Sequence, residues 1–141
     1  MSKEKWIFGA TAIGFGGFGI ALLIFPSLLG LVGIKELTNS GLVEARAMYG
    51  GLQIGFGLFF LLALNRPKWF QPALIIHICV VGGLVIGRIF GLVVEKWQAK
   101  PLIYIILAAE IVLVILSTTA FINLKNEKKT RDDAIEKKRI I

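Results

Sequence analysis

The sequence predicts an all-α fold, a bundle of four transmembrane helices, and three observations support this. First, 56% of the 141 residues are hydrophobic and 18% are charged, against about 45–50% and about 25% in soluble domains; the mean hydropathy is +0.78. Second, the apolar residues gather in four stretches separated by prolines and charged residues. Third, each stretch is close in length to the roughly 20-residue helix that crosses a bilayer.

Four spans are predicted, at residues 6–25, 47–64, 73–94 and 102–122. A proline lies at or near a boundary of each span, and proline is tolerated in the first turn of a helix but cannot continue one. Helices are predicted rather than strands because lipid offers no partner to an open strand edge, and none of the stretches alternates as barrel strands do. The first span is longer than the roughly 7–15 apolar residues of a signal peptide and no small-x-small cleavage site follows it, so we expect it to be retained.

Two further segments complete the predicted architecture. Residues 26–42 are too interrupted to span a membrane but apolar enough to lie on one, so a short interfacial helix is expected there, ending in the turn residues 39–41. Residues 125–141 hold seven Lys or Arg and four Asp or Glu, and they are predicted to form a basic cytoplasmic tail, either as a solvated extension of the last helix or as a loose segment. The chain would thus consist of a transmembrane domain, residues 1–124, and this tail.

The basic residues indicate an orientation. Four spans place both termini on one side, and that side would carry eleven of the sixteen Lys and Arg residues, whereas the opposite side would carry four and Arg88 would lie inside a span. By the positive-inside rule, both termini are predicted to be cytoplasmic in a multi-pass protein of the cell inner membrane. Trp6, Trp69 and Trp97 fall at predicted span ends, where aromatic belts form.

The sequence contains 16 glycines, most of them within the spans. The first span includes a match to GxGxxG, but a dinucleotide site requires a preceding strand and this match would lie in mid-membrane, so we reject it. Glycines four residues apart allow two helices to approach closely. We therefore predict packing faces at Gly51, Gly55, Gly83, Gly87 and Gly91, and the partner helix would belong either to the same chain or to a second copy in a homo-oligomer.

Five polar side chains are predicted to form a cluster in the outer half of the bundle. An ionisable residue inside a span costs about 2.5–3.5 kcal/mol and marks a candidate functional site. At a rise of 1.5 Å per residue, three of the five lie roughly 9–12 Å below the outer span ends, and two lie at the entry of the second span. Arg46 and Gln53, seven residues apart, should share a helix face. The predicted cluster is Glu44, Arg46, Gln53, Arg88 and Glu110.

This cluster has three interpretations. In the first, Arg88 and Glu110 form a buried ion pair, and Glu44 and Arg46 complete a network that fixes helix register, with little net stabilisation because desolvation offsets the attraction. In the second, Arg46 and Arg88 bind the carboxylate or phosphate of a small anionic or amphipathic, lipid-like ligand, and glycine-lined grooves accept its tail. In the third, the protein is a small proton-coupled transporter that cycles a proton on Glu110, a role that a neighbouring arginine would impair.

No catalytic residue, metal site or cofactor is predicted. His77 is expected to make an interfacial hydrogen bond, and Ser117, Thr118 and Thr119 are expected to bond backbone carbonyls of their own helix, so an enzyme is the least favoured class. No metal-ligand cluster accompanies the histidine, and the single cysteine, Cys79, excludes an intramolecular disulfide. The basic residues form no stripe with exposed aromatics, so membrane lipids are expected partners and nucleic acid is not.

Three short motifs and a proline-terminated first span carry a family resemblance. The motifs are E-x-R-x-x-Y-G-G at residues 44–51, G-R at Gly87–Arg88 and A-E at Ala109–Glu110. Together they resemble a family of small bacterial four-helix membrane proteins that is classed as a domain of unknown function, and that is distantly similar in architecture to DoxX-like proteins. The resemblance covers about residues 6–122 and implies the same fold and the same polar positions, without an activity.

Overall fold

The computed structural model describes residues 3–140, and this part of the chain contains helices and no strand. The predicted all-α class is therefore confirmed. In chain order the elements are α1 (Lys3–Ile24), η1 (Pro26–Val32), α2 (Asn39–Ala45), η2 (Arg46–Gly51), α3 (Leu52–Leu64), η3 (Pro67–Trp69), α4 (Phe70–Val94) and α5 (Pro101–Ile140). The elements η1 and η3 are 3₁₀-helices, and η2 is a π-helical turn that joins α2 and α3 into one continuous rod.

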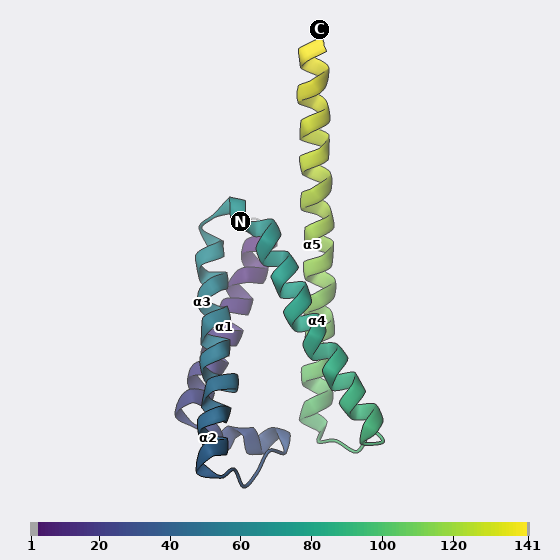
Figure 1. The fold of residues 1–141 in the computed structure, drawn as a ribbon. Helices are drawn as coiled ribbons and strands as arrows, with labels where there is room; N and C mark the ends of the chain where they lie inside the picture. Colours follow the sequence, from purple (N-terminus) through teal and green to yellow (C-terminus); the bar gives the residue numbers. More distant parts are fainter. Residues whose placement is uncertain (1–2, 141) are drawn as a thin grey trace.

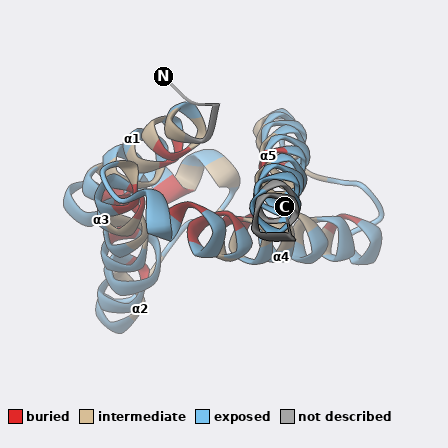
Figure 2. Ribbon diagram, turned by 90° about the horizontal axis from the view of Figure 1, so that it is seen from above, coloured by how far each residue is buried: buried red, intermediate tan, exposed pale blue. Residues whose placement is uncertain are grey.

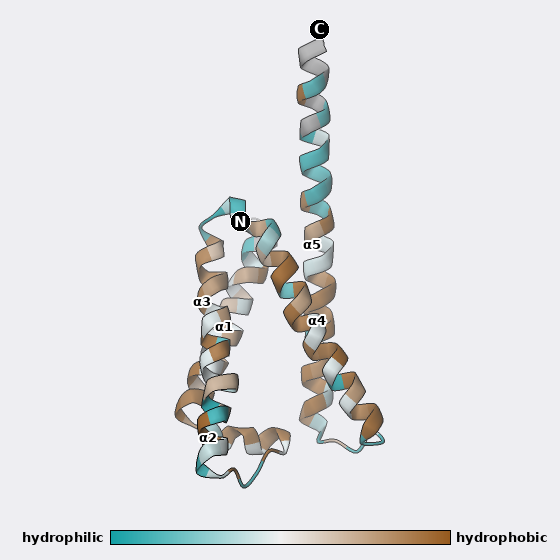
Figure 3. Cartoon of the chain, viewed as in Figure 1, coloured by the Kyte–Doolittle hydropathy of each residue, from teal (hydrophilic) through white to brown (hydrophobic). Residues whose placement is uncertain are grey.

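Four helical segments are long and apolar enough to cross a membrane, at residues 5–24, 39–64, 67–94 and 101–131. Hydrophobic residues predominate along these segments, and hydrophilic residues predominate in the last part of α5 (Figure 3). Large apolar side chains point outward: Ile13, Ile86 and Phe90 are 78%, 71% and 70% exposed. So large an exposed apolar surface is expected where the surrounding solvent is lipid. The structure therefore fits a membrane protein.

One predicted boundary differs clearly from the structure. The second rod begins at Asn39, well before the predicted residue 47, because the Thr38 hydroxyl caps it by accepting a hydrogen bond from the Gly41 N–H at 3.2 Å. The predicted turn at residues 39–41 is therefore the first turn of a helix. Of the two alternatives for the charged tail, the structure shows the helical one, because α5 continues as a helix to Ile140.

The helices form two hairpins. α1 packs along η2 and α3, and α4 packs along α5, whereas α3 makes few contacts with α4. Figure 1 shows the two hairpins converging at the end that carries η3, and diverging toward the end that carries η1. We refer to these as the η3 end and the η1 end. The separation at the η1 end leaves room for a pocket between the hairpins.

The hydrophobic core lies at the η3 end, where all four long helical segments meet. Phe8 of α1 stacks on Phe60 of α3 with ring centroids 5.9 Å apart, and it meets Phe70 of α4 edge-on at 5.4 Å. Such offset and edge-on pairs are the favoured geometries of aromatic rings. The buried members of this core are Phe8, Phe60, Ala63, Phe70, Ala73, Leu74 and Ala120. Viewed from above, buried residues line the junction of α1, α3 and α4 (Figure 2).

The five glycines predicted to pack are not the ones that do so within the chain. A Cβ added at Gly55, Gly83, Gly87 or Gly91 would meet nothing within 4 Å, and at Gly51 it would meet only a carbonyl oxygen of its own turn at 3.9 Å. Within the described part of the chain, none of the five therefore makes a helix contact so close that it requires glycine. Their use by a second copy stays a prediction.

Other glycines bring α1 close to the rod that η2 and α3 form. A Cβ on Gly57 would lie 2.7 Å from the backbone nitrogen of Gly16, and one on Gly19 would lie 2.8 Å from the backbone nitrogen of Ile54. Backbone atoms cannot move aside as a flexible side chain can, so these positions require glycine. Gly16 and Gly19 belong to the GxGxxG stretch, and these two of its glycines serve helix packing.

Candidate functional site

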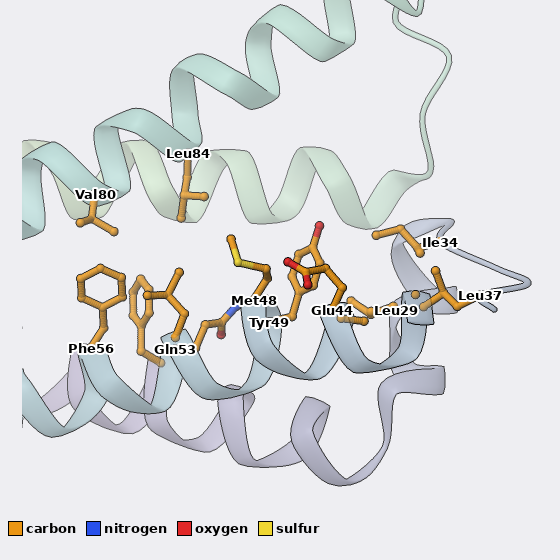
Figure 4. A pocket seen from close by; sticks show the side chains of 14 residues that line it. Leu29, Ile34, Leu37, Glu44, Met48, Tyr49, Gln53, Phe56, Val80 and Leu84 are labelled. Carbon is orange, nitrogen blue, oxygen red and sulfur yellow. The ribbon is translucent and has the colours of Figure 1, made fainter. Parts of the chain in front are cut away.

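A pocket of about 630 Å³ lies between the two hairpins, toward the η1 end. Figure 4 shows the 14 side chains that line it. Its volume lies within the range of about 300–1,000 Å³ that is typical of small-molecule sites. Most of the wall is apolar and comes from several elements, including Phe15 of α1, Leu29 of η1, Ile34 and Leu37 of the loop that follows, Phe56 of α3, and Val80 and Leu84 of α4.

The segment between α1 and α2 closes the pocket at the η1 end. Gly33 ends η1 with a φ of +103°, a conformation that glycine adopts without a steric penalty. The Ile34 N–H then donates to the Leu29 carbonyl at 3.1 Å, which turns the loop back toward the pocket. Across the gap, Lys100 Nζ donates to the Gly30 carbonyl at 2.7 Å. This bond ties the loop between α4 and α5 to η1, so both hairpins support this wall.

Three polar side chains of the second rod line the pocket: Glu44 from α2, Tyr49 from η2 and Gln53 from α3 (Figure 4). Glu44 is the one acidic or basic residue in the lining. Within the described part of the chain, the single salt bridge joins Arg88 to Glu110, so Glu44 has no ionic partner there. The pocket therefore combines apolar walls with one carboxylate, one phenol and one amide.

The π-helical turn explains why Gln53 lies in this wall. Gln53 was predicted to share a face with Arg46, as it would in a regular α-helix. A π turn closes i→i+5 hydrogen bonds and so holds one residue more than an α turn. The residues after η2 are therefore rotated relative to those before it. Arg46 and Gly50 contact α1, whereas Gln53 lines the pocket.

Neither arginine of the predicted cluster lines the pocket. Arg46 Nε donates to the Leu23 carbonyl at 3.2 Å, in the last turn of α1, where cations complement the carbonyl end of a helix. Arg88 donates to Glu110 through two bonds, from Nε to Oε2 at 3.0 Å and from Nη2 to Oε1 at 2.7 Å. The structure therefore brings Arg88 and Glu110 together, and it places Glu44 in a different environment from both.

The Arg88–Glu110 pair links α4 to α5. Its side chains are 23% and 11% exposed, and the two parallel bonds match the fork of the guanidinium to both carboxylate oxygens. The ion pair of the structural interpretation is therefore present, but Arg46 and Glu44 do not join it: Arg46 bonds the Leu23 carbonyl, and Glu44 lines the pocket. A proton could reach the Glu110 carboxylate only at the expense of these charge-assisted bonds, so the geometry does not favour the transporter interpretation.

His77 lies in a polar network that was not predicted. His77, Ser117 and Thr11 are 0%, 0% and 3% exposed. Ser117 Oγ lies 2.8 Å from His77 Nδ1, and Thr11 Oγ1 lies 3.0 Å from His77 Nε2. The expected interfacial histidine is therefore buried among α1, α4 and α5, and Ser117 bonds His77 instead of its own helix. Thr119 does bond the Ile115 carbonyl of its own helix, at 2.8 Å, as predicted.

The hydrogen-bond partners favour one tautomer of His77. The Thr11 hydroxyl lies 2.7 Å from the Ile7 carbonyl, to which it can only donate, and a hydroxyl engaged in this way accepts from the imidazole. This arrangement corresponds to the tautomer with the proton on Nε2, in which Nδ1 accepts from the Ser117 hydroxyl. Ser117 and His77 have the spacing of a nucleophile and its base, but both are fully buried and neither lines the pocket between the hairpins. The network is therefore a polar link among three helices.

The described residues contain no group of three or more His, Cys, Asp or Glu side chains that could hold a metal ion. Cys79 of α4 is exposed, and its thiol is free.

Sequence comparison adds one finding: a family model described as a domain of unknown function, DUF4345, matches residues 4–121. No curated protein and no solved structure gives a match.

Proposed function

The chain belongs to the DUF4345 family, and from that premise we propose that it is a multi-pass membrane protein that binds a lipid-like molecule between its two hairpins. The observation that carries this proposal is the pocket of about 630 Å³ with its largely apolar lining and a few convergent polar groups. That combination is typical of small-molecule sites. An apolar tail would contact Phe15, Phe56 and Leu84, and a polar head would lie near Glu44.

In this proposal the four segments all span the cell inner membrane, in an arrangement distantly like that of DoxX-like proteins. The η3 end would be cytoplasmic, because Lys5, Arg66 and Lys68 lie there together with the basic start of the α5 extension. The pocket would then open in the outer half of the bilayer, under η1 as an interfacial helix. Trp69 and Trp97, at opposite ends of α4, would lie in the two interfacial layers.

Binding in such a pocket requires no chemistry at the ligand. The described residues place no nucleophile and base together in its lining, and the Arg88–Glu110 pair lies outside it. The protein would thus act as an accessory protein or carrier that holds a lipid-like molecule out of the bulk bilayer. Because lipid tails are as apolar as the pocket wall, a tail that enters from the bilayer gains little hydrophobic free energy, and its affinity would come mainly from close packing in the pocket and from the contacts of its polar head.

The test is saturable photolabelling of the full chain in uncharged alkyl maltoside micelles. The probe is dodecanol with a diazirine in its chain, and labelled residues are mapped by mass spectrometry. We expect labelling of pocket residues that excess unlabelled dodecanol suppresses. Leu84→Trp, which fills the pocket, should reduce this labelling severalfold. Ile86→Trp is the matched control, because Ile86 lies on the same helix, is 71% exposed and does not line the pocket.

The proposal is wrong if labelling is spread over the outer helix surfaces and is not suppressed by dodecanol. It is also wrong if Leu84→Trp and Ile86→Trp reduce pocket labelling equally. Either result would leave the structural interpretation of the polar residues as the better account.

A further inference from the structure

We infer that the head group recognised in this pocket is an ammonium, so that the ligand is an amphiphilic amine. This inference rests on the proposed function of the pocket and specifies the chemistry of its ligand. It reverses the charge expected from the sequence, in which Arg46 and Arg88 were paired with an anion. The reversal follows from the position of Glu44 relative to these two arginines.

Glu44 gives the pocket a negative charge that the described part of the protein does not neutralise. The guanidinium of Arg46 is directed to the Leu23 carbonyl on α1, and that of Arg88 is engaged by both oxygens of Glu110. At the same end of the molecule, Lys100 donates to the Gly30 carbonyl. Glu44 is an exposed residue, and it has no ionic partner in the described part of the chain. A ligand ammonium would supply that partner through a charge-assisted hydrogen bond.

The other polar groups of the lining suit a cation as well. Tyr49 and Gln53 follow Glu44 along the same rod and line the same wall (Figure 4). The Tyr49 hydroxyl and the Gln53 amide oxygen can accept hydrogen bonds from an ammonium, and the face of the Tyr49 ring attracts a cation. An anionic head group would find donors at the same two residues, but it would be repelled by the Glu44 carboxylate.

Competition in the photolabelling assay tests this inference. The competitors are dodecylammonium, dodecanol and dodecyl sulfate, which have the same tail and differ in head-group charge. One charge-assisted bond should make dodecylammonium effective at about tenfold lower concentration than dodecanol. Glu44→Gln should make the two equally effective. Glu95→Gln, a change at an exposed acid at the end of α4 that does not line the pocket, should keep the tenfold preference.

The outcomes separate this inference from the proposed function. Equal potency of all three competitors in the wild-type protein, or a preference for the sulfate, overturns the ammonium assignment while saturable pocket labelling still supports the pocket's function. Loss of saturable labelling defeats both. A fourth competitor, lysophosphatidylethanolamine, identifies the source of the amine. Potency like that of dodecylammonium indicates a phospholipid amine, and potency below that of dodecanol indicates a free amine whose tail bears no phosphate.

Discussion

At the scale of single residues, the partners of charged groups were easier to predict than those of hydroxyls. Arg88 and Glu110 were each expected to need an opposite charge inside a span, and they are bonded to each other. Ser117 and Thr11 have alternatives on their own helices, so their sequence positions do not reveal that they meet His77. A charged side chain inside a span requires a partner of opposite charge, whereas a hydroxyl can bond either a carbonyl of its own helix or a side chain of another helix.

Breaking the Arg88–Glu110 pair should destabilise the protein more than removing it entirely. We expect Glu110→Gln to lower the free energy of unfolding by about 2 kcal/mol, because it weakens two bonds to a charged group and leaves Arg88 without a counter-ion. The double replacement Arg88→Met with Glu110→Leu should recover most of this loss. Unfolding in mixed micelles measures both values, and a double variant less stable than Glu110→Gln would contradict the account.

The His77 network should show energetic coupling between helices. In a double-mutant cycle, Ser117→Ala and His77→Phe should be coupled by about 0.6–1.7 kcal/mol, the range of hydrogen bonds between transmembrane helices. The control cycle pairs His77→Phe with Thr119→Val, since Thr119 bonds its own helix. That pair should be additive to within about 0.5 kcal/mol. Equal coupling in the two cycles would show that the Ser117–His77 bond is not specific.

At the scale of elements, hydropathy predicted the positions of the four apolar helices, because span length follows from bilayer thickness. It did not predict which helix faces pack. The glycine stripe Gly83–Gly91 is regular, yet a Cβ added at any of its three glycines would meet nothing within 4 Å, whereas Gly57 packs on Gly16. Regular spacing shows that the glycines share one face of the helix, but only the tertiary arrangement determines which element packs on that face. The π turn likewise has no clear sequence signal, so the direction of Gln53 could not be predicted.

Two glycines of α3, two residues apart, allow a direct test of this arrangement. Gly57→Ala should lower the free energy of unfolding by about 1–3 kcal/mol, because the added methyl group would overlap the backbone of Gly16. Gly55→Ala should change it by less than about 0.5 kcal/mol or raise it slightly, because the methyl group meets open space and alanine favours the helix. Denaturation of both variants in micelles measures the difference. Equal effects would refute the assigned packing faces.

At the scale of the whole molecule, the pairing of helices into two hairpins was beyond sequence analysis. The predicted cluster assumed that three spans meet in the outer half and share their polar side chains. In the structure the hairpins join instead at the η3 end, through the core around Phe8 and Phe60, and the gap near Glu44 becomes a pocket. The predicted depth of a residue along its helix does not specify which neighbours surround that residue.

The central claim is that the hairpins pack through a hydrophobic core at the η3 end and are separated by a pocket toward the η1 end, where the Lys100–Gly30 bond spans the gap. Two double-cysteine variants, in a Cys79→Ala background in membranes, test it most directly. Phe8→Cys with Phe70→Cys replaces two core rings whose centroids lie 5.4 Å apart, and this pair should cross-link with a short bifunctional thiol reagent. Met48→Cys with Leu84→Cys faces the pocket from two helices and should cross-link only through a longer reagent. Cross-linking of the Met48 and Leu84 pair by the short reagent, with none for the Phe8 and Phe70 pair, would contradict the account.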